Sequence, residues 1–516
     1  MVSTFHGLET AIRGMYTQQS ALYTTGHNIS NANTPGYTRQ RVNFEQTSPY
    51  PAPSMNRPQI PGQVGTGVEA GSIERVREQF LDVQFRGENN KLGYWETKME
   101  SLKKMEEVMN EPSESGLAKT MDQLWQSLQD LAVNPTNDGA RSVVRQRAVA
   151  VAETFNYISS SLSGVQKDIQ NELSVTEKNV NALLNQLHQL NNQISDVEPH
   201  GLMPNDLYDE RDRLIDDLSQ LVDVKVSYQA NGGNASPLAE GRAIVYLASG
   251  ETNLRSAMLV GKDGANSIKV NYDSTTSVVN EIEVGNQKMP IASFESIGKL
   301  KGLIESYGYV DQNGDIQGSY ANMLAELDNL AFTFTEAFNA QHQAGVSPAQ
   351  MMDNTVPSYD FFKDQNNTDL DATNKAGFAS RMEVSAGILQ NLDHIASAST
   401  ANPTMGNAEN ITALANVIDK LPLNYGANPT TFKSHYESMI GDMAVQSQEA
   451  VRLSSNSEVL RSAVDTRRQS VSSVSLDEEM TNMIKFQHAY NASARIITLT
   501  DEMLDKIING MGTGGR

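Results

Sequence analysis

Histidine is the side chain best suited to acid–base and metal chemistry near neutral pH, and this chain of 516 residues contains eight histidines. They are scattered, and none forms an HExxH pattern or another closely spaced ligand pair. The nucleophile motif GxSxG and the phosphate loop GxxxxGK[ST] are also missing. The chain contains no cysteine, which excludes thiol nucleophiles, thiolate metal sites and disulfides. We therefore predict no enzymatic activity and no bound cofactor or metal.

Two carboxylate-rich segments resemble parts of binding sites. Residues 311–315 (DQNGD) begin like a calcium loop, but Ile316 and Asn322 stand where such a loop needs Gly and Glu. We interpret this segment as a solvated turn. Residues 477–479 (DEE) lie just before an apolar stripe, where acidic side chains complement the positive end of a helix. For them, helix capping is the favoured interpretation.

Apolar residues at heptad spacing occupy both ends of the chain. A 3.5-residue period is typical of helices that pack against other helices. We therefore predict that the two ends pair and form an assembly interface. Its predicted residues are Leu8, Ile12, Met15, Leu22 and Ile29 near the start, and Met480, Met483, Tyr490, Ile497, Leu504 and Ile508 near the finish.

A turn is predicted directly after the first helix, which we expect to span about residues 3–29. The sequence NISNANTPGY that follows is rich in residues that favour turns, and proline cannot continue a helix. The residues expected to form this turn are Asn31, Asn33, Pro35, Gly36 and Tyr37.

The pattern between the two ends changes twice. Helical periodicity is expected from about Glu74 to Met109 and in one very long helix over residues 141–197. Alternating apolar residues over residues 225–310 then predict strands, and helical periodicity returns over residues 320–344 and 430–470. The simplest architecture is a hairpin with a helical stem and the β material at its far end.

The predicted fold is therefore multidomain and mainly α, with a β-rich insert. Its terminal helices pair into a coiled-coil-like stem, followed by a long antiparallel helical bundle and outer β or mixed domains. The predicted divisions are a terminal assembly region (1–75 and 470–516), a long-helix bundle (76–224, 320–345 and 430–469), a β-rich outer domain (225–319) and a loop-rich mixed segment (346–429).

Composition limits the possible partners. The net charge of −22 argues against nucleic acid and anionic membrane surfaces, because both require basic patches. No apolar run approaches the roughly 18 residues that a membrane span needs, so no membrane insertion is expected. The N-terminal sequence has neither the basic region nor the continuous apolar region of a cleavable signal peptide.

The sequence around the predicted turn resembles a known family. Residues 26–41 (GHNISNANTPGYTRQR) are similar to the signature of bacterial flagellar rod, hook and hook-associated axial proteins. Residues 65–68 (GTGV) and 475–490, with SLDEE, FQ and Tyr490, are similar to members of that family at the junction between hook and filament.

The resemblance implies a structural, extracellular component of the flagellum that adapts the hook to the filament. It also implies export, without cleavage, through the flagellar type III apparatus with a dedicated chaperone. The implied partners are the hook protein, the second hook-associated junction protein and like subunits in a ring. The alternative that the residues leave open is a self-contained coiled-coil interaction scaffold, whose terminal helices pair only within the monomer and form no flagellar tube.

Overall fold

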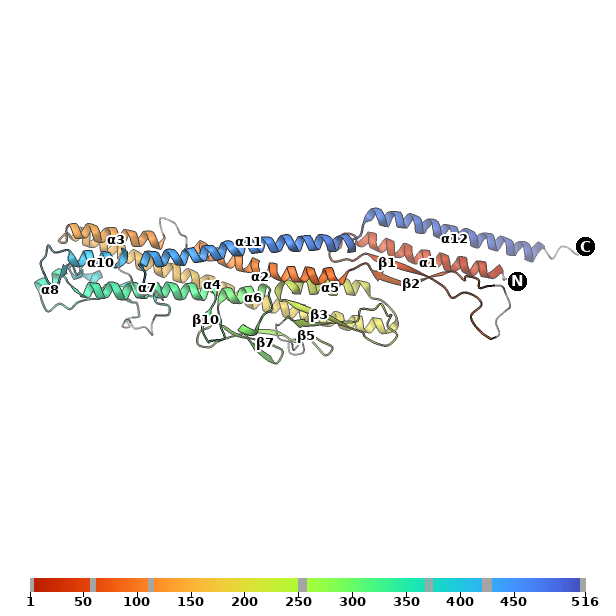
Figure 1. The fold of residues 1–516 in the computed structure, drawn as a ribbon, viewed down its shortest axis with the longest axis horizontal. Helices are drawn as coiled ribbons and strands as arrows, with labels where there is room; N and C mark the ends of the chain where they lie inside the picture. The colour runs from red at the N-terminus through yellow and green to blue at the C-terminus, as the bar shows by residue number, and fades with distance from the viewer. Residues whose placement is uncertain are drawn as a thin grey trace, which may run out of the picture.

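The protein is an elongated rod with both chain ends at the same end (Figure 1). The computed structural model describes residues 4–55, 62–109, 116–248, 258–366, 370, 375–419 and 429–510. Within these ranges the chain runs from helices through strands and back to helices. This confirms the predicted multidomain fold, with long helices at both termini and a β-containing middle. Residues 511–516 of the predicted terminal region and 420–428 of the predicted loop-rich segment lie outside the described ranges.

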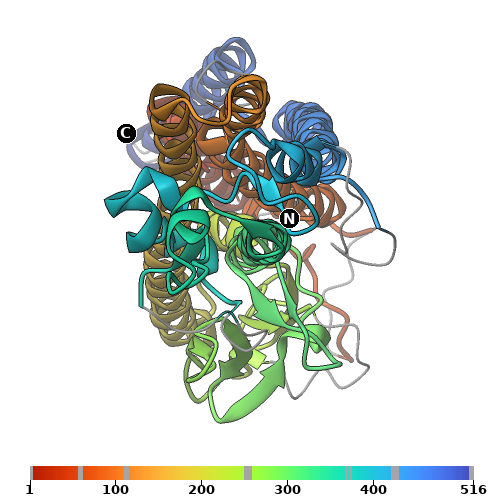
Figure 2. The ribbon, with the colours of Figure 1, turned by 90° about the vertical axis from the view of Figure 1, so that its left-hand side faces the viewer.

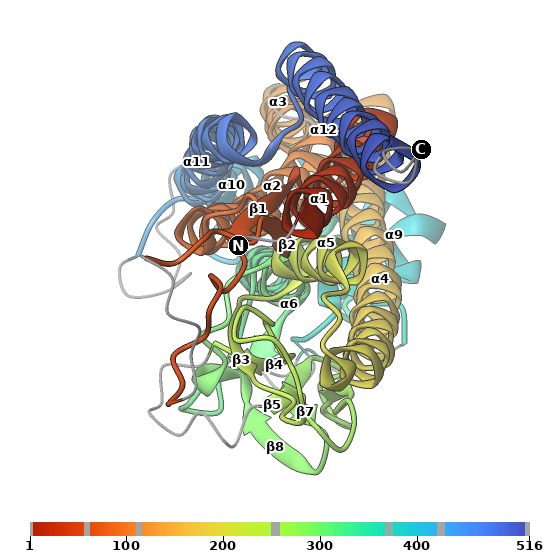
Figure 3. The same ribbon diagram turned by 90° about the vertical axis from the view of Figure 1, so that its right-hand side faces the viewer.

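Two antiparallel helices form the end of the rod that carries both termini. Helix α1 (Thr4–Asn31) and helix α12 (Leu476–Gly510) lie side by side there (Figures 1 and 3). A two-stranded antiparallel sheet, β1 (Gln40–Gln46) and β2 (Val68–Arg75), packs beside α1, with a bulge between Asn43 and Phe44.

The rest of the rod is a bundle built around one very long helix. Helix α4 has 60 residues, which corresponds to about 90 Å. It begins where the Asn137 side chain accepts a hydrogen bond from the Ala140 amide at 3.2 Å, a typical N-cap. The helices of the bundle are α2 (Gln79–Met109), α3 (Leu117–Val133), α4 (Asp138–Val197), α5 (Asn205–Leu221), α6 (Lys299–Tyr307), α7 (Ser319–Gln343) and α11 (Phe432–Ser472).

The strands lie along one side of the bundle. One sheet has the order β3-β4-β5, and a second has the order β10-β9-β7-β6 with β8 also paired to β7. The expectation that β material sits at the far end of a hairpin is wrong, because Figure 1 shows it beside the middle of the rod. The strands are β3 (Val224–Gln229), β4 (Arg242–Leu247), β5 (Met258–Val260), β6 (Ile268–Tyr272), β7 (Val279–Val284), β8 (Gln287–Pro290), β9 (Tyr309–Val310) and β10 (Ile316–Gln317).

Side chains of α4 hold these sheets in place. Asn191 donates to the Ala243 carbonyl at 2.7 Å and accepts from the Ala243 amide at 3.0 Å. Asn181 makes the same pair of bonds to the backbone of Ile268, both at 2.8 Å. Each asparagine therefore occupies the edge of a strand as a neighbouring strand would, which explains why the sheets lie along α4 rather than beyond it.

The far end of the rod combines helices with short strands. Figure 2 looks onto this end, where the cyan segment with α8 and α10 lies near α3 and α11. The elements of this segment are β11 (Gly345–Val346), α8 (Pro348–Met352), β12 (Phe362–Asp364), β13 (Met382–Val384), α9 (Ala386–Gln390), β14 (Ala398–Ser399) and α10 (Glu409–Asp419). Short 3-10 helices occur at Glu198–His200, Ile291–Ser293, Phe378–Ser380 and Leu392–His394.

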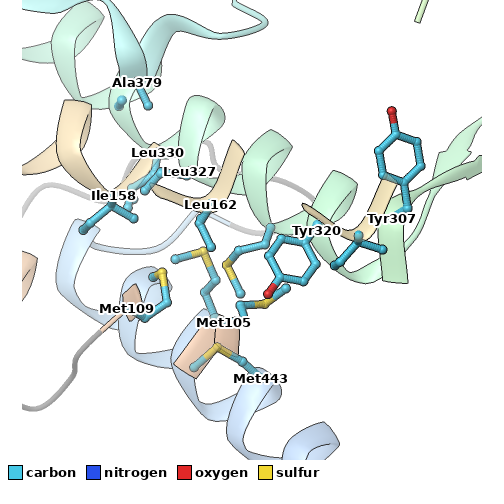
Figure 4. Packing of buried hydrophobic residues seen from close by; sticks show 14 of the residues in the cluster. Met105, Met109, Ile158, Leu162, Tyr307, Tyr320, Leu327, Leu330, Ala379 and Met443 are labelled. Carbon is cyan, nitrogen blue, oxygen red and sulfur yellow. The ribbon is translucent and has the colours of Figure 1, made fainter. Parts of the chain in front are cut away.

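A continuous apolar core fills the bundle and the inner faces of the sheets. In Figure 4, Met105 and Met109 from α2 lie near Met443 from α11 and Leu162 from α4. Methionine fills irregular gaps between helices because its unbranched side chain is adaptable.

One predicted boundary and one predicted element type differ from the structure. Helical structure was expected from Glu74, but β2 continues to Arg75 and α2 begins only at Gln79. The expected β region also contains the helix α6, whose Leu300 and Leu303 are buried against the bundle. Nine residues are too few for their periodicity to stand out from neighbouring strands.

Candidate assembly site at the paired termini

Small side chains are buried along α1. Ala11 and Ala21 are 6% and 1% exposed, and Thr25 and Asn28 continue the same row at steps of three or four residues. Gly14 lies in this row, and a Cβ added to it would sit 3.3 Å from Ser493 Oγ on α12. Small residues allow the two helix backbones to approach closely.

The larger apolar residues predicted as the α1 seam lie beside this row rather than on it. Leu8, Ile12, Met15, Leu22 and Ile29 are all only partly buried. They are displaced around the helix from Ala11, Ala21 and Asn28 by roughly one residue step. The frame of the heptad therefore differs from the predicted one, because close packing selects small residues for the centre of the contact.

The predicted α12 residues divide into two groups. Met483, Tyr490, Ile497 and Leu504 are partly buried, whereas Met480 and Ile508 are 57% and 72% exposed. Tyr490, Ile497 and Leu504 follow one another at steps of seven residues and share a face with Ser493, which lies opposite α1.

A second apolar stripe on α12 was not predicted. It lies roughly a quarter turn around the helix from the row that contacts α1, and its residues recur at steps of three or four. Its members are Ile496 (50% exposed), Leu499 (56%), Met503 (49%) and Ile507 (46%). The sequence signal was available, since α12 carries more apolar residues than one seam can hold. We call these four residues the outer stripe.

The predicted turn follows α1 as a series of tight hydrogen bonds. The Thr34 amide donates to the Asn31 carbonyl at 2.9 Å, and the Tyr37 amide donates to the Thr34 carbonyl at 3.2 Å. Gly36 has a φ of +81°, a conformation that side-chain-bearing residues rarely adopt. Asn33 and Pro35 are exposed on the outside of the turn.

The Asn28 side chain joins this turn to the start of β1. Its amide uses all four of its hydrogen-bonding positions, which is the full capacity of that group. The Oδ1 atom accepts from the Tyr37 hydroxyl at 2.8 Å and the Gln40 amide at 3.0 Å, while Nδ2 donates to the Gln40 carbonyl at 2.8 Å and to Glu479 at 3.1 Å. Burial and nearby carboxylates raise the pKa of Tyr37 above its ordinary value, so the hydroxyl stays protonated as a donor.

An ion pair then links the turn to α12. Arg39 Nε donates to Glu479 at 2.8 Å, and its Nη1 atom donates to Glu478 at 2.7 Å. The Glu479 side chain is 3% exposed and that of Glu478 is 62% exposed. Both acids lie in the first turn of α12, as the capping interpretation expects. The contacts of Glu479 with Arg39 and Asn28 were not predicted, because nothing in one sequence links residues so far apart.

Within the described ranges, no group of three His, Cys, Asp or Glu side chains is placed to hold a metal ion. The segment at 311–315 forms a turn in which Asp311 accepts from the amides of Asn313 and Asp315 at 2.8 and 2.9 Å. None of the helices that the structure describes contains an apolar stretch that could span a bilayer.

Three regions match known protein families. Residues 102–362 match the helical domain of the flagellar hook-associated protein FlgK. Residues 8–38 match the flagella basal body rod protein family, and residues 468–510 match the C-terminal family of the flagellar basal body rod FlgEFG protein. The two rod-protein matches coincide with the paired helices.

Full-length relatives carry the same description. The chain is 46% identical to flagellar hook-associated protein 1 of Bacillus subtilis over the whole of both chains. It is 24% identical to the protein of that name from Salmonella typhimurium, covering 97% of this chain and 98% of the relative. The fold resembles that of the flagellar hook junction protein FlgK from Burkholderia pseudomallei, with a TM-score of 0.58 and 15% identity over 76% of this chain and all of the other. The chain thus belongs to the family of flagellar hook-associated protein 1, whose members are structural proteins of the bacterial flagellum.

Proposed function

We propose that this protein is the adaptor between hook and filament, and that its paired terminal helices hold it there by packing against neighbouring subunits. The observation that carries the proposal is the outer stripe of α12. Four large apolar side chains lie on one helix face and are each about half exposed. An exposed apolar row on a helix is typical of an interaction site.

The apolar area left exposed on the terminal helices favours assembly over an isolated monomer. Burying the remaining half of a large aliphatic side chain contributes roughly 1 kcal/mol, so the outer stripe offers about 4 kcal/mol per subunit before association costs. Helix α1 has exposed aromatic residues of its own, at Phe5, Tyr16 and Tyr23. Contacts with neighbours would therefore stabilise these helices through the faces that the monomer leaves exposed.

The proposed partners follow from the family. They are the hook protein, the second hook-associated junction protein and like subunits arranged in a ring. The proposal includes an extracellular location in the flagellum, reached through the type III export apparatus with a chaperone. It is supported by membership of a family of flagellar axial proteins, which associate with one another.

Substituting Leu499 by Asp tests the proposal, because it charges the centre of the outer stripe without touching the row that faces α1. Cells that carry only L499D should have hooks without filaments, while the purified variant should keep the helical content of the natural protein. The matched control is Val459→Asp on α11, where the natural side chain is 64% exposed. Filaments of normal number on L499D cells would contradict the proposal.

A further inference from the structure

Three asparagines in this chain are followed directly by glycine, at residues 231–232, 313–314 and 509–510. In such a pair the glycine nitrogen can attack the carboxamide carbon of the asparagine, because glycine has no side chain to hinder the approach. The new N–C bond closes a succinimide ring, and ammonia leaves with the proton of the glycine amide. Water then opens the ring at either carbonyl, which gives aspartate or isoaspartate. The surrounding structure decides which pair reacts.

The Asn231 carboxamide is held at both ends. Its Nδ2 atom donates to Glu198 at 2.5 Å, and its Oδ1 atom accepts from the Ser195 hydroxyl at 2.9 Å. Glu198 is 0% exposed and also accepts from the Tyr208 hydroxyl and the Gly241 amide, so its carboxylate is fixed in place. Turning the carboxamide towards the next residue therefore breaks two hydrogen bonds, one of them to a buried carboxylate.

The Asn313 carboxamide has no such restraint. It lies in the turn between β9 and β10, is exposed, and makes no hydrogen bond to any residue that the structure describes. Gly314 has a φ of +86°, and a Cβ added to it would meet nothing within 4 Å, so the space beside the pair is open. The Gly314 amide donates to the Asp311 carbonyl at 3.2 Å, at the long end of the hydrogen-bond range. This one long bond is what the reaction must break.

The two glycines are otherwise alike. Gly232 has a φ of +76° and, like Gly314, open space where a Cβ would lie. The two pairs therefore differ chiefly in how firmly the asparagine side chain is held. The pair at 509–510 is not comparable with them, because it ends α12 and its rate depends on whether that helix is formed.

From this contrast we propose that Asn313 is a site of spontaneous deamidation in the folded protein, whereas Asn231 is protected. The reaction adds one negative charge, which changes the net charge from −22 to −23. The new carboxylate lies between Asp311 and Asp315, where like charges repel one another. Because the acid does not revert to the amide, the product accumulates as the protein ages. The proposal does not depend on the function proposed above.

Isoaspartate alters the turn more than aspartate does. Its main chain runs through the former side chain and so gains one carbon atom. The two strands that flank the turn are joined by the residue pairs Val310–Ile316 and Tyr309–Gln317, a very short ladder. We expect the isoaspartate form to lose this pairing, so that the turn opens at the edge of its sheet.

Timed peptide mapping of the full-length natural protein tests the proposal. The purified protein is kept folded at mildly alkaline pH, and mass spectrometry of its proteolytic peptides follows the conversion of each asparagine to the acid. Asn313 should convert at least about 10-fold faster than Asn231, because two hydrogen bonds, one to a buried carboxylate, correspond to at least that factor. Synthetic peptides of residues 308–318 and 226–236 provide reference rates that correct for local sequence.

Two variants separate the structural cause from the sequence. Ser195→Ala removes one restraint on Asn231 and should raise its rate about 2- to 10-fold, while the rate at Asn313 stays unchanged. Asn313→Gln keeps an exposed, uncharged amide but requires a larger, less favourable ring, so conversion at this position should stop.

The proposal fails if Asn313 and Asn231 convert equally fast in the folded protein after correction by the two peptides. It also fails if Asn313 converts far more slowly in the folded protein than in its own peptide. That result would show that the bond from the Gly314 amide to Asp311 is enough to protect the pair.

Discussion

Arg39 and Glu479 are separated by 440 residues of chain, yet Arg39 Nε donates a hydrogen bond to Glu479 at 2.8 Å. The same carboxylate accepts from Asn28 at 3.1 Å. The turn after the first helix is thereby tied to the start of the last helix. This contact sets where α12 begins to run beside α1, so the turn and the helix pair form one structural unit.

The first prediction concerns this ion pair. Glu479→Gln should lower the free energy of local opening of the paired helices α1 and α12 by about 1–3 kcal/mol, because a buried hydrogen-bonded charge is lost. Hydrogen exchange at the amides of α1 and of the first turns of α12 measures this. Glu478→Gln is the control: its side chain is 62% exposed, so its effect should stay below about 1 kcal/mol. Equal effects of the two variants would argue against a special role for Glu479.

The second prediction concerns the close contact between α1 and α12. Ala21→Leu should destabilise the pair by about 1–3 kcal/mol, since Ala21 is 1% exposed and the added atoms have no space. Hydrogen exchange at the amides of α1 and α12, measured at increasing temperature, gives the change in stability of the helix pair. Tyr16→Leu on the same helix replaces a side chain that is 61% exposed and should have little effect. If Ala21→Leu were harmless, small residues would not be what centres the contact.

Much of the fold follows from the sequence, but the frame of the terminal contact does not. The period of Leu8, Ile12 and Met15 predicts an amphipathic helix correctly. It does not show that the partner helix lies over Gly14 and Ala21. Small residues let two helices approach closely, but they add nothing to the apolar periodicity from which the contact is predicted. The position of the sheets could not be predicted from the sequence either, since it depends on hydrogen bonds from α4 side chains to strands far along the chain.

The third prediction concerns Asp212, a buried carboxylate of α5. Asp212 is 3% exposed and faces Arg75, Arg77 and Arg86, which hold the pKa of its carboxyl well below the usual range. Asp212→Asn should cost about 1–3 kcal/mol of unfolding free energy, because it removes a buried charged hydrogen-bond acceptor that the three cations share, although each keeps another carboxylate. Urea unfolding of the purified variant measures the loss.

The matched control for that substitution lies on the same helix. The Asp217 side chain is 52% exposed and pairs with Arg213 at 3.1 Å. Asp217→Asn should change the unfolding free energy by less than about 1 kcal/mol. Similar losses of unfolding free energy in the two variants would show that the buried ion pairs of Asp212 contribute no more to stability than the exposed pair of Asp217.

The fourth prediction is a pH dependence that arises from His342. The ring is 1% exposed, its Nε2 accepts from the Ala396 amide at 3.0 Å, and its Nδ1 lies 2.9 Å from the Tyr359 carbonyl. Burial lowers the pKa of His342 to about 4, so the folded protein holds it neutral. The contribution of His342 to the unfolding free energy is fully present above about pH 6.5. It is lost as the pH falls from 6.5 towards 4, because the unfolded chain gains a proton on this ring before the folded protein does. The total loss is about 3 kcal/mol.

Replacing the ring tests this assignment. His342→Gln should flatten the decline in unfolding free energy between pH 6.5 and 4, measured by denaturant titration at each pH. His200→Gln changes an exposed histidine and should leave the decline intact. An unchanged slope in His342→Gln would mean that other groups cause the acid sensitivity.

The proposal that neighbouring subunits complete the terminal helices is tested by hydrogen exchange across residues 5–29 and 476–508. The comparison is between the purified monomer and the protein assembled at the junction, with α4 as the internal reference. We expect these amides to exchange at least 100-fold faster than those of α4 in the monomer, and to become strongly protected on assembly. Protection in the monomer equal to that of α4, with no gain on assembly, would show that neighbouring subunits do not complete these helices.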